Sequence, residues 1–196
     1  MRLLKAKTGN DPNLEAQDDR ELLRIASEGE RRAFEVLFKR HYLGVRRIVT
    51  SVLGPVDEVE DVVQNVFMRI FRTGSDFQGK AKFTSWLYRI AVNMTYDHMR
   101  RKKRRNRLIE HFLENRSDEG LHDSPLDESL SREEIGLAMG ALNRIKENKR
   151  TVFILFELQG MTLEEIAQSL NLSTTTVWSR LYQARKDFRK HYEKIT

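Results

Sequence analysis

The stretch from Met161 to Lys186, MTLEEIAQSLNLSTTTVWSRLYQARK, decides the fold of the C-terminal part of the chain. Thr162 is followed three residues later by Glu165, a capping box that starts a helix expected over Leu163–Leu170. A polar turn follows, and a second helix is expected from about Thr174. Two short helices joined by a tight turn form a helix-turn-helix, which can place its second helix in a DNA major groove.

The second helix has one apolar and one polar face. Val177, Leu181, Ala184 and Phe188 recur at spacings of four, three and four residues, which predicts an inward stripe. The remaining side chains hydrogen-bond, stack or carry positive charge, as groups that contact bases and phosphates do. They are Thr174, Thr175, Trp178, Ser179, Arg180, Tyr182, Gln183, Arg185, Lys186 and Arg189. An ordinary amphipathic hairpin with a solvated face remains the alternative interpretation of this segment.

Composition narrows the class of protein. The chain has 196 residues, a net charge of +6 and no cysteine, which excludes disulfides and thiolate chemistry. The positive charge suits a polyanionic partner but does not require one. No apolar run approaches the ~20 residues of a membrane helix, and the N-terminus lacks the apolar core of a signal peptide. We therefore expect a soluble, cytoplasmic protein without membrane insertion.

Apolar residues recur at helical spacing along most of the chain, and alternating strand patterns are nearly absent. We therefore expect an all-α fold of two small helical domains. Before the helix-turn-helix, helices are expected over about 18–29, 31–53, 57–74 and 83–105. The third should bury Val59, Val63, Val66, Phe67, Ile70 and Phe71. Between Glu110 and Glu134 acidic residues outnumber basic ones nine to two, which indicates a flexible linker. The expected division is a tail at 1–17, a domain at 18–107, a linker at 108–134 and a domain at 135–196.

A basic run ends the fourth expected helix, where seven of the eight residues from Arg100 to Arg107 are cationic. Upstream on the same helix lie Trp86, Tyr88 and Tyr96. Rings interleaved with cations can stack on unpaired bases and neutralise phosphates. A solvated helix end would also be basic, and the spacing of Trp86 favours a core position over base stacking.

Three segments in this order resemble the extracytoplasmic-function group of bacterial sigma factors. They are DVVQNVFMRIFR (Asp61–Arg72), FTSWLYRIAVNMTYDHMRRKKR (Phe83–Arg104) and TVFILFELQGMTLEEIAQSLNLSTTTVWSRLYQAR (Thr151–Arg185), which are similar to the second and fourth regions of that family. The resemblance covers about 18–192. It implies a factor that directs RNA polymerase to promoters and promotes promoter melting.

The resemblance also implies roles for individual residues. Asp61, Gln64, Asn65 and Met68 should contact the clamp of the largest polymerase subunits, and the C-terminal domain should meet the flap of the second largest. The proximal promoter element should be melted and held by Phe77, Gln78, Lys80, Trp86, Arg89, Asn93, Tyr96 and Arg100, with Asn93 and the preceding loop forming a flipped-base pocket. The distal element should be read by Thr175, Thr176, Trp178, Ser179, Arg180, Tyr182, Gln183 and Lys186.

The chain departs from the family pattern at a few positions. Leu142-Asn143 replaces a frequent Leu-Pro, and Thr175-Thr176-Val177 replaces Gly-Thr-Val, changes that helix starts tolerate. Trp178 and Gln183 stand where arginines are common, which implies an unusual target sequence. The chain ends soon after the second helix, so we expect control by a separate anti-sigma factor.

No catalytic constellation is visible, since the five histidines are scattered and no phosphate-binding glycine loop occurs. We expect no enzymatic activity, no cofactor and no metal. A helix-turn-helix regulator that does not bind core polymerase is the main alternative, but it leaves the Asp61–Arg72 and Phe83–Arg104 segments unexplained. An enzyme with an appended DNA-binding domain is a further alternative, and it lacks a candidate active site.

Overall fold

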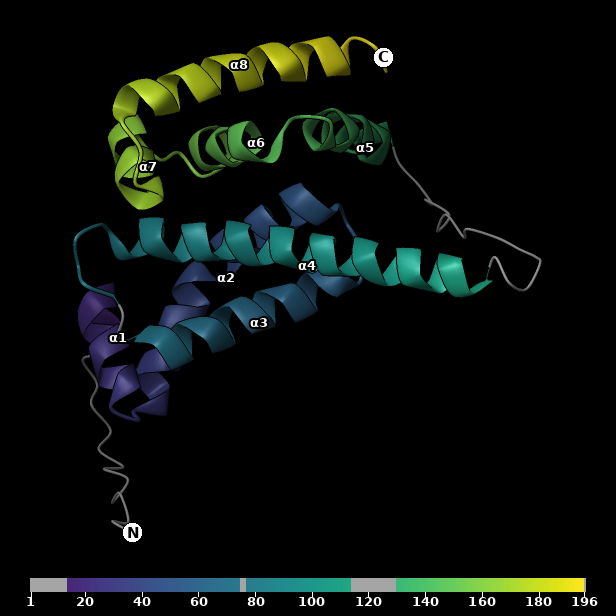
Figure 1. The fold of residues 1–196 in the computed structure, drawn as a ribbon. Coiled ribbons are helices and arrows are strands. Elements are labelled where there is room, and N and C mark those ends of the chain that lie inside the picture. The colour runs from purple at the N-terminus through teal and green to yellow at the C-terminus, as the bar shows by residue number, and fades with distance from the viewer. Residues whose placement is uncertain (1–13, 75–76, 114–129, 196) are drawn as a thin grey trace.

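A computed structural model describes residues 14–74, 77–113 and 130–195, and every regular element within them is helical (Figure 1). This confirms the predicted all-α fold. The N-terminal group comprises η1 (Leu14–Ala16), α1 (Asp19–Ser27), α2 (Arg31–Leu53), α3 (Glu58–Thr73) and α4 (Phe83–Leu113). The C-terminal group comprises α5 (Leu130–Asn143), α6 (Glu147–Phe153), the π-helical η3 (Ile154–Leu158), α7 (Leu163–Leu170) and α8 (Thr174–Tyr192).

Helix α2 is the centre of the N-terminal bundle and packs against α1, α3 and α4. Its length follows from local signals, because Gly54 at φ +85° ends it where a side-chain-bearing residue would be strained. Its inward face buries Leu37, Val45, Ile48 and Val49 completely or nearly so. The bundle is therefore held by a continuous aliphatic core.

Asp19 joins α1 to α2. Its carboxylate lies 2.9 Å from Nε2 of His41 and 3.0 Å from Nη1 of Arg40. Burial raises the pKa of Asp19, but the hydrogen bonds and charges of His41 and Arg40 outweigh it, so the pKa lies below its ordinary value. The first helix is thus fixed by a charge network as well as by Leu22 and Leu23, which are buried.

The structure differs from two of the sequence expectations. Phe71 does not lie in the core: it is 43% exposed, and its ring meets the edge of Phe34 at the rim of the bundle, 5.1 Å between centroids. Helix α4 continues to Leu113 rather than ending near Arg105, because Arg107, Leu108 and Glu110 are good helix formers and no glycine or proline interrupts the segment. Most of the predicted acidic linker, 114–129, lies outside the described residues.

The helix-turn-helix forms as the sequence predicts. The Thr162 and Glu165 capping box starts α7, and Asn171 adopts the left-handed conformation that turns the chain toward α8. Ser173 caps α8 by accepting a hydrogen bond from the Thr176 amide at 3.1 Å. Val177, Leu181 and Ala184 are buried against the rest of the domain, so the opposite face of α8 points outward.

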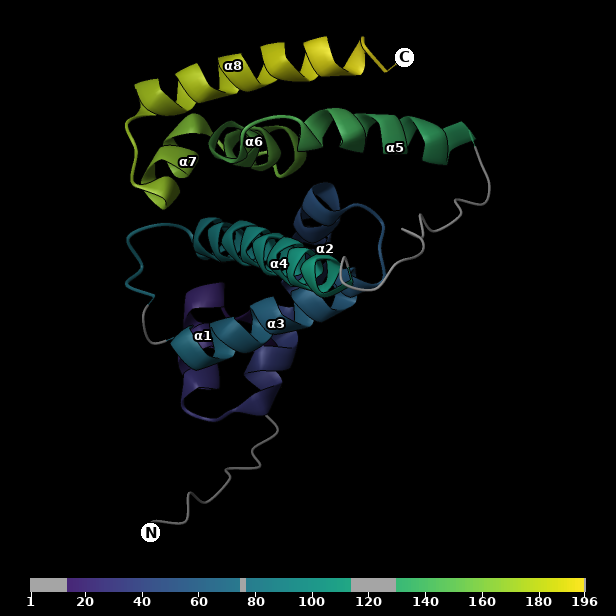
Figure 2. The ribbon, with the colours of Figure 1, turned by 45° about the vertical axis from the view of Figure 1, so that its right-hand side comes forward.

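The C-terminal group lies against α4. Both views show α3 on one side of α4 and α6 and α7 on the other, with α8 farther away, while the end of α2 passes α4 and reaches toward α5 (Figures 1 and 2). Helices α4 and α7 are in contact, as are α2 and α5. One face of α4 is consequently covered by α6 and α7, which begin 34 and 50 residues after α4 ends.

Candidate nucleic-acid interface

The outward face of α8 is exposed and chemically suited to read DNA. Trp178 and Tyr182 are each 57% exposed, and their rings stack 5.7 Å apart at an interplanar angle of 10°. The remaining predicted residues are exposed except for Thr176 and Arg180, which are half-buried. The Thr176 hydroxyl lies 2.8 Å from that of Ser173, so it takes part in the helix cap. The exposed members are Thr175, Ser179, Gln183 and Lys186.

The loop before α4 is anchored by aromatic rings. Phe77, Phe83 and Trp86 form a triangle with centroid distances of 5.2 to 5.9 Å. Trp86 is half-buried in this cluster, whereas Gln78 and Lys80 are exposed. The cluster fixes the loop to the start of α4 and leaves its polar side chains facing solvent.

The middle of α4 faces the C-terminal domain instead of solvent. Arg89 donates from Nη1 to the carbonyl oxygen of Ser169 at 2.7 Å. Tyr96 is only 2% exposed, and its hydroxyl accepts a hydrogen bond from Nε of Arg150 at 2.8 Å. Burial raises the pKa of the Tyr96 phenol, and the Arg150 charge opposes this effect in part. Two predicted DNA-binding side chains are therefore occupied by the chain itself.

Arg100 is paired at the edge of the same face. Its guanidinium lies 2.8 Å from Oε1 of Glu147 in α6 and 2.6 Å from Oδ1 of Asp97 in its own helix. Hydrogen bonds to Asp97 and Glu147 raise its pKa above the ordinary value. The rest of the basic run, from Arg101 to Arg107, is exposed apart from Lys102, which pairs with Glu58 of α3.

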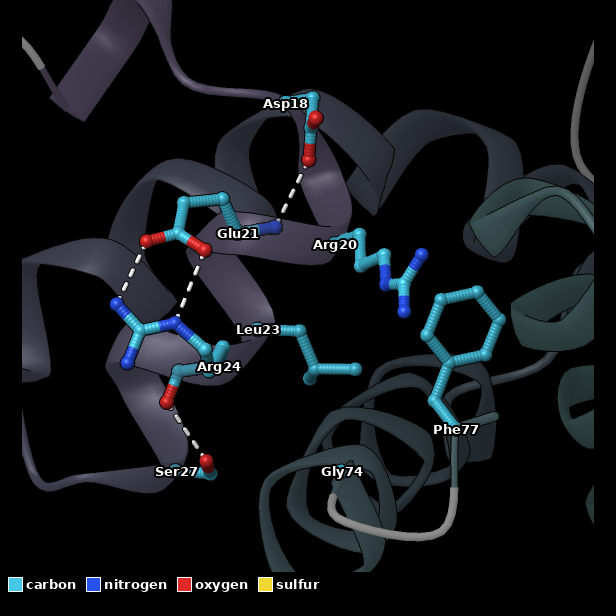
Figure 3. A pocket seen from close by; sticks show the side chains of 8 residues that line it. All are labelled: Asp18, Arg20, Glu21, Leu23, Arg24, Ser27, Gly74 and Phe77. Atoms are coloured by element: carbon cyan, nitrogen blue, oxygen red, sulfur yellow. Dashed lines mark hydrogen bonds and ion pairs between the residues drawn. The ribbon is translucent and has the colours of Figure 1, made fainter. Parts of the chain in front are cut away.

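Asn93 and the loop do not form a single pocket in this arrangement. Phe77 lines a cavity of about 300 Å³ between α1 and the end of α3 (Figure 3). Asn93 lines a different cavity of about 430 Å³, together with Glu147, Asn148, Thr151, Leu170, Leu172 and Arg180 of the C-terminal domain. The predicted base pocket would require the C-terminal domain to move away from α4.

The loop cavity includes Arg20, which sequence reasoning did not single out. The Arg20 side chain extends from α1 toward the Phe77 ring (Figure 3). It also packs over Gly79, where an added Cβ would lie 2.9 Å from the guanidinium carbon, and φ is +67°. No periodicity or motif connects Arg20 to the loop, since the contact exists only in the tertiary structure.

The outward strip of α3 contains the predicted polymerase-binding residues. Asp61, Gln64, Asn65 and Met68 are all exposed, and Asn65 donates to the Asp61 carbonyl at 2.7 Å. Phe71 continues the strip one turn beyond Met68, so the spacing that places Met68 outward could also have placed Phe71 there. This strip combines polar residues with two exposed apolar side chains, as a protein-docking surface does.

The described residues contain no cluster of three or more His, Asp or Glu side chains arranged to hold a metal ion. Within the same residues, none of the helices combines the length and the apolarity needed to cross a bilayer. The main exposed features are the outward face of α8, the strip on α3 and the basic run of α4. Fold and surfaces together define a two-domain helical DNA-binding protein with a separate docking face.

Comparison with known proteins identifies the family. The Sigma-70 region 2 family model matches residues 37–105, and the Sigma-70, region 4 model matches residues 129–188. The chain is 31% identical over 175 residues to the ECF RNA polymerase sigma-E factor of Haemophilus influenzae, covering 86% of this chain and 92% of that protein. It is 28% identical over 180 residues to the RNA polymerase sigma-H factor of Pseudomonas aeruginosa, covering 88% and 93%.

Solved structures agree with this assignment. The chain is similar to CnrH in its complex with the cytosolic domain of CnrY, with a TM-score of 0.68 and 26% identity over 91% of this chain and 99% of that one. Its fold also resembles the Bartonella quintana sigma factor RpoE, bound there to the anti-sigma factor NepR, with a TM-score of 0.61 and 22% identity over 82% of this chain and 96% of that one. The chain belongs to the extracytoplasmic-function sigma factors of the sigma-70 family, which direct RNA polymerase to promoters. The resemblance inferred from the sequence is confirmed, and the alternative of a regulator independent of core polymerase is not favoured.

Proposed function

We propose that this sigma factor initiates transcription through three separate surfaces. The exposed strip of α3 binds the polymerase clamp, the outward face of α8 reads the distal promoter element, and the loop with α4 captures the melted proximal element. Residues 18–107 and 135–196 act as the two working domains, joined by the acidic stretch 108–134. The factor supplies binding surfaces to the polymerase and performs no covalent chemistry of its own.

The separation of these exposed surfaces supports the proposal most directly. The α3 strip with Met68 at 47% exposure and the α8 face with Trp178 at 57% exposure belong to different domains. A chain in this family needs to hold polymerase and duplex DNA at the same time, and two such faces make this possible. Thymine methyl groups and base edges in the major groove suit the rings and polar groups of α8.

An anti-sigma factor is proposed as a further partner. The Bartonella RpoE is solved in complex with the anti-sigma factor NepR, and CnrH is solved in complex with the cytosolic domain of CnrY. We also propose contact with the flap of the second-largest polymerase subunit, and a working location in the cytoplasm, where the polymerase is.

Reconstitution with core RNA polymerase tests the proposal. Purified protein and core enzyme are incubated with a genomic DNA library, and transcript start sites are mapped. We expect transcription start sites that appear only when both proteins are present and that share two upstream sequence elements. Absence of factor-dependent starts, with core polymerase active on a control factor, would refute it.

A further inference from the structure

We propose that Arg20 of α1 is a positioning residue for the loop that precedes α4, and that it thereby sets the base preference of the factor at the proximal promoter element. The inference rests on the proposed function, because it assigns a support to the loop residues Gln78 and Lys80 that are proposed to contact the melted strand. Arg20 itself belongs neither to the loop nor to α4. It acts through Gly79, which stands between those two side chains.

The guanidinium of Arg20 lies flat on the backbone of Gly79. A Cβ atom added to Gly79 would lie 2.9 Å from Cζ of Arg20, 3.0 Å from Nη1 and 3.2 Å from Nε. Because these three distances are nearly equal, the plane of the guanidinium faces the glycine and does not meet it edge-on. Gly79 also has φ +67°, so both its conformation and the space beside it favour glycine. The arginine and the glycine therefore form a matched contact between α1 and the loop.

Helix α1 supports the same segment at a second point. Leu23 is 3% exposed, and a Cβ atom added to Gly74, at the end of α3, would lie 2.8 Å from its Cδ1 atom. Arg20 and Leu23 are three residues apart, so they share one face of the helix. The Phe77 amide donates to the Gly74 carbonyl at 3.1 Å, and the Arg20 side chain extends toward the Phe77 ring (Figure 3). One face of α1 therefore forms a wall of the cavity that Figure 3 shows.

Two contacts hold the loop on either side of Gln78. Phe77 is fixed by the aromatic cluster at the start of α4, and Gly79 is fixed by Arg20. Gln78 lies between these two residues, and its side chain is exposed. A base contact is selective only when its hydrogen-bonding groups are held in place by the residues around them. Loss of the guanidinium should therefore weaken selectivity without removing any side chain that is proposed to contact DNA.

Two substitutions separate positioning from a direct contact with DNA. Arg20→Met keeps the apolar stem and removes the guanidinium, whereas Arg20→Lys keeps the charge and removes the planar group. Arg24→Met is the matched control, because Arg24 lines the same cavity from the same helix but pairs with Glu21 and Glu28. All three variants change exposed side chains, so they should fold and co-purify with core polymerase as the unaltered chain does.

The measurement is the base preference at the proximal element. Core polymerase with each factor transcribes a promoter library in which the proximal positions are randomised, and sequencing gives the ratio of the favoured base to the other three. Arg20→Met and Arg20→Lys should both lower this ratio about 3- to 10-fold at one or two positions, because a misplaced group keeps part of its discrimination. Arg24→Met should keep the preference of the unaltered chain. The salt dependence of promoter binding should be equal in Arg20→Met and Arg24→Met.

Gly79→Ala tests whether Arg20 acts through Gly79. The positive φ strains an alanine whatever lies beside it, but the close approach to Cζ exists only when Arg20 is present. Gly79→Ala should therefore cost less base preference in an Arg20→Ala background than in the unaltered chain. Losses that simply multiply would mean that the two residues act independently, which would refute this route.

The outcomes distinguish this proposal from the proposed function. Unchanged base preference in both Arg20 variants, with a selective unaltered factor, would overturn the positioning role and leave the proposed function intact. Normal preference in Arg20→Lys, with a salt slope about 0.7 smaller in Arg20→Met than in the control, would instead make Arg20 a direct phosphate contact. An unaltered factor without any proximal preference, but with normal distal selectivity, would refute the proposed function of the loop and this role of Arg20 with it.

Discussion

The contact between Tyr96 and Arg150 can be weighed by a small series of substitutions. Tyr96→Phe removes the acceptor of the 2.8 Å hydrogen bond and keeps the ring under the guanidinium. Hydrogen bonds to charged groups contribute about 1.5 to 3 kcal/mol, so the protein should lose roughly this much stability. Tyr96→Leu also removes the ring and should cost about 1 kcal/mol more through the lost cation–π contact.

A double-mutant cycle tests whether Arg150 is the cause. Arg150→Met keeps the apolar stem of the side chain and removes its donors. In that background the cost of Tyr96→Phe should fall by more than the ~0.5 kcal/mol within which independent sites add. Urea unfolding followed by circular dichroism and tryptophan fluorescence provides the free energies. If Tyr96→Phe were equally costly in both backgrounds, Tyr96 and Arg150 would not be coupled in solution, and this contact would not hold the C-terminal domain against α4.

Three further predictions concern the remaining surfaces and the fold. Asp61→Arg with Asn65→Arg should abolish co-purification with core polymerase and leave the helical spectrum unchanged, because both side chains are exposed on α3. Gln183→Ala should relax selectivity at one or two distal positions, at about 1 to 3 kcal/mol for each lost base-edge contact, whereas Lys186→Ala should weaken binding to all sequences alike; selection from a randomised duplex separates the two. The pKa of Asp19 lies below its ordinary value, so the stability that this carboxylate contributes is present above pH ~4 and is lost as the pH falls through the folded pKa. Asp19→Asn should show a shallower acid-induced decline in unfolding titrations, and an unchanged decline would contradict this role.

The elements predicted best from the sequence are those defined by local signals. Helix α2 runs from Arg31 to Leu53 and α7 from Leu163 to Leu170, as expected from the glycine after the first and the capping box before the second. These signals act within a few residues, so they can be recognised in the sequence without knowledge of the rest of the fold. The end of α4 was misplaced because no glycine or proline marks it, so the basic run before Arg107 was the last clear local signal.

The candidate site was predicted less completely, for a physical reason. Periodicity separates the buried face of α4 from its outward face, and it favoured a core position for Trp86, which is half-buried against Phe77 and Phe83. It cannot say what covers the outward face. Tyr96 meets Arg150, 54 residues later, and Arg20 meets the loop near Gly79 through tertiary contacts alone. An aromatic and cationic surface suits both a DNA strand and a domain rich in carbonyls and carboxylates.

One face of α4 illustrates this shared chemistry. The groups of α4 proposed to hold unpaired bases, a tyrosine ring and two arginines, are the same groups that Arg150, Glu147 and the Ser169 carbonyl contact in the structure. The strip proposed to bind polymerase lies on α3, where Asp61 and Met68 are exposed although the C-terminal domain lies against α4. Substitutions in that strip should therefore test polymerase binding without disturbing the contacts between the two domains.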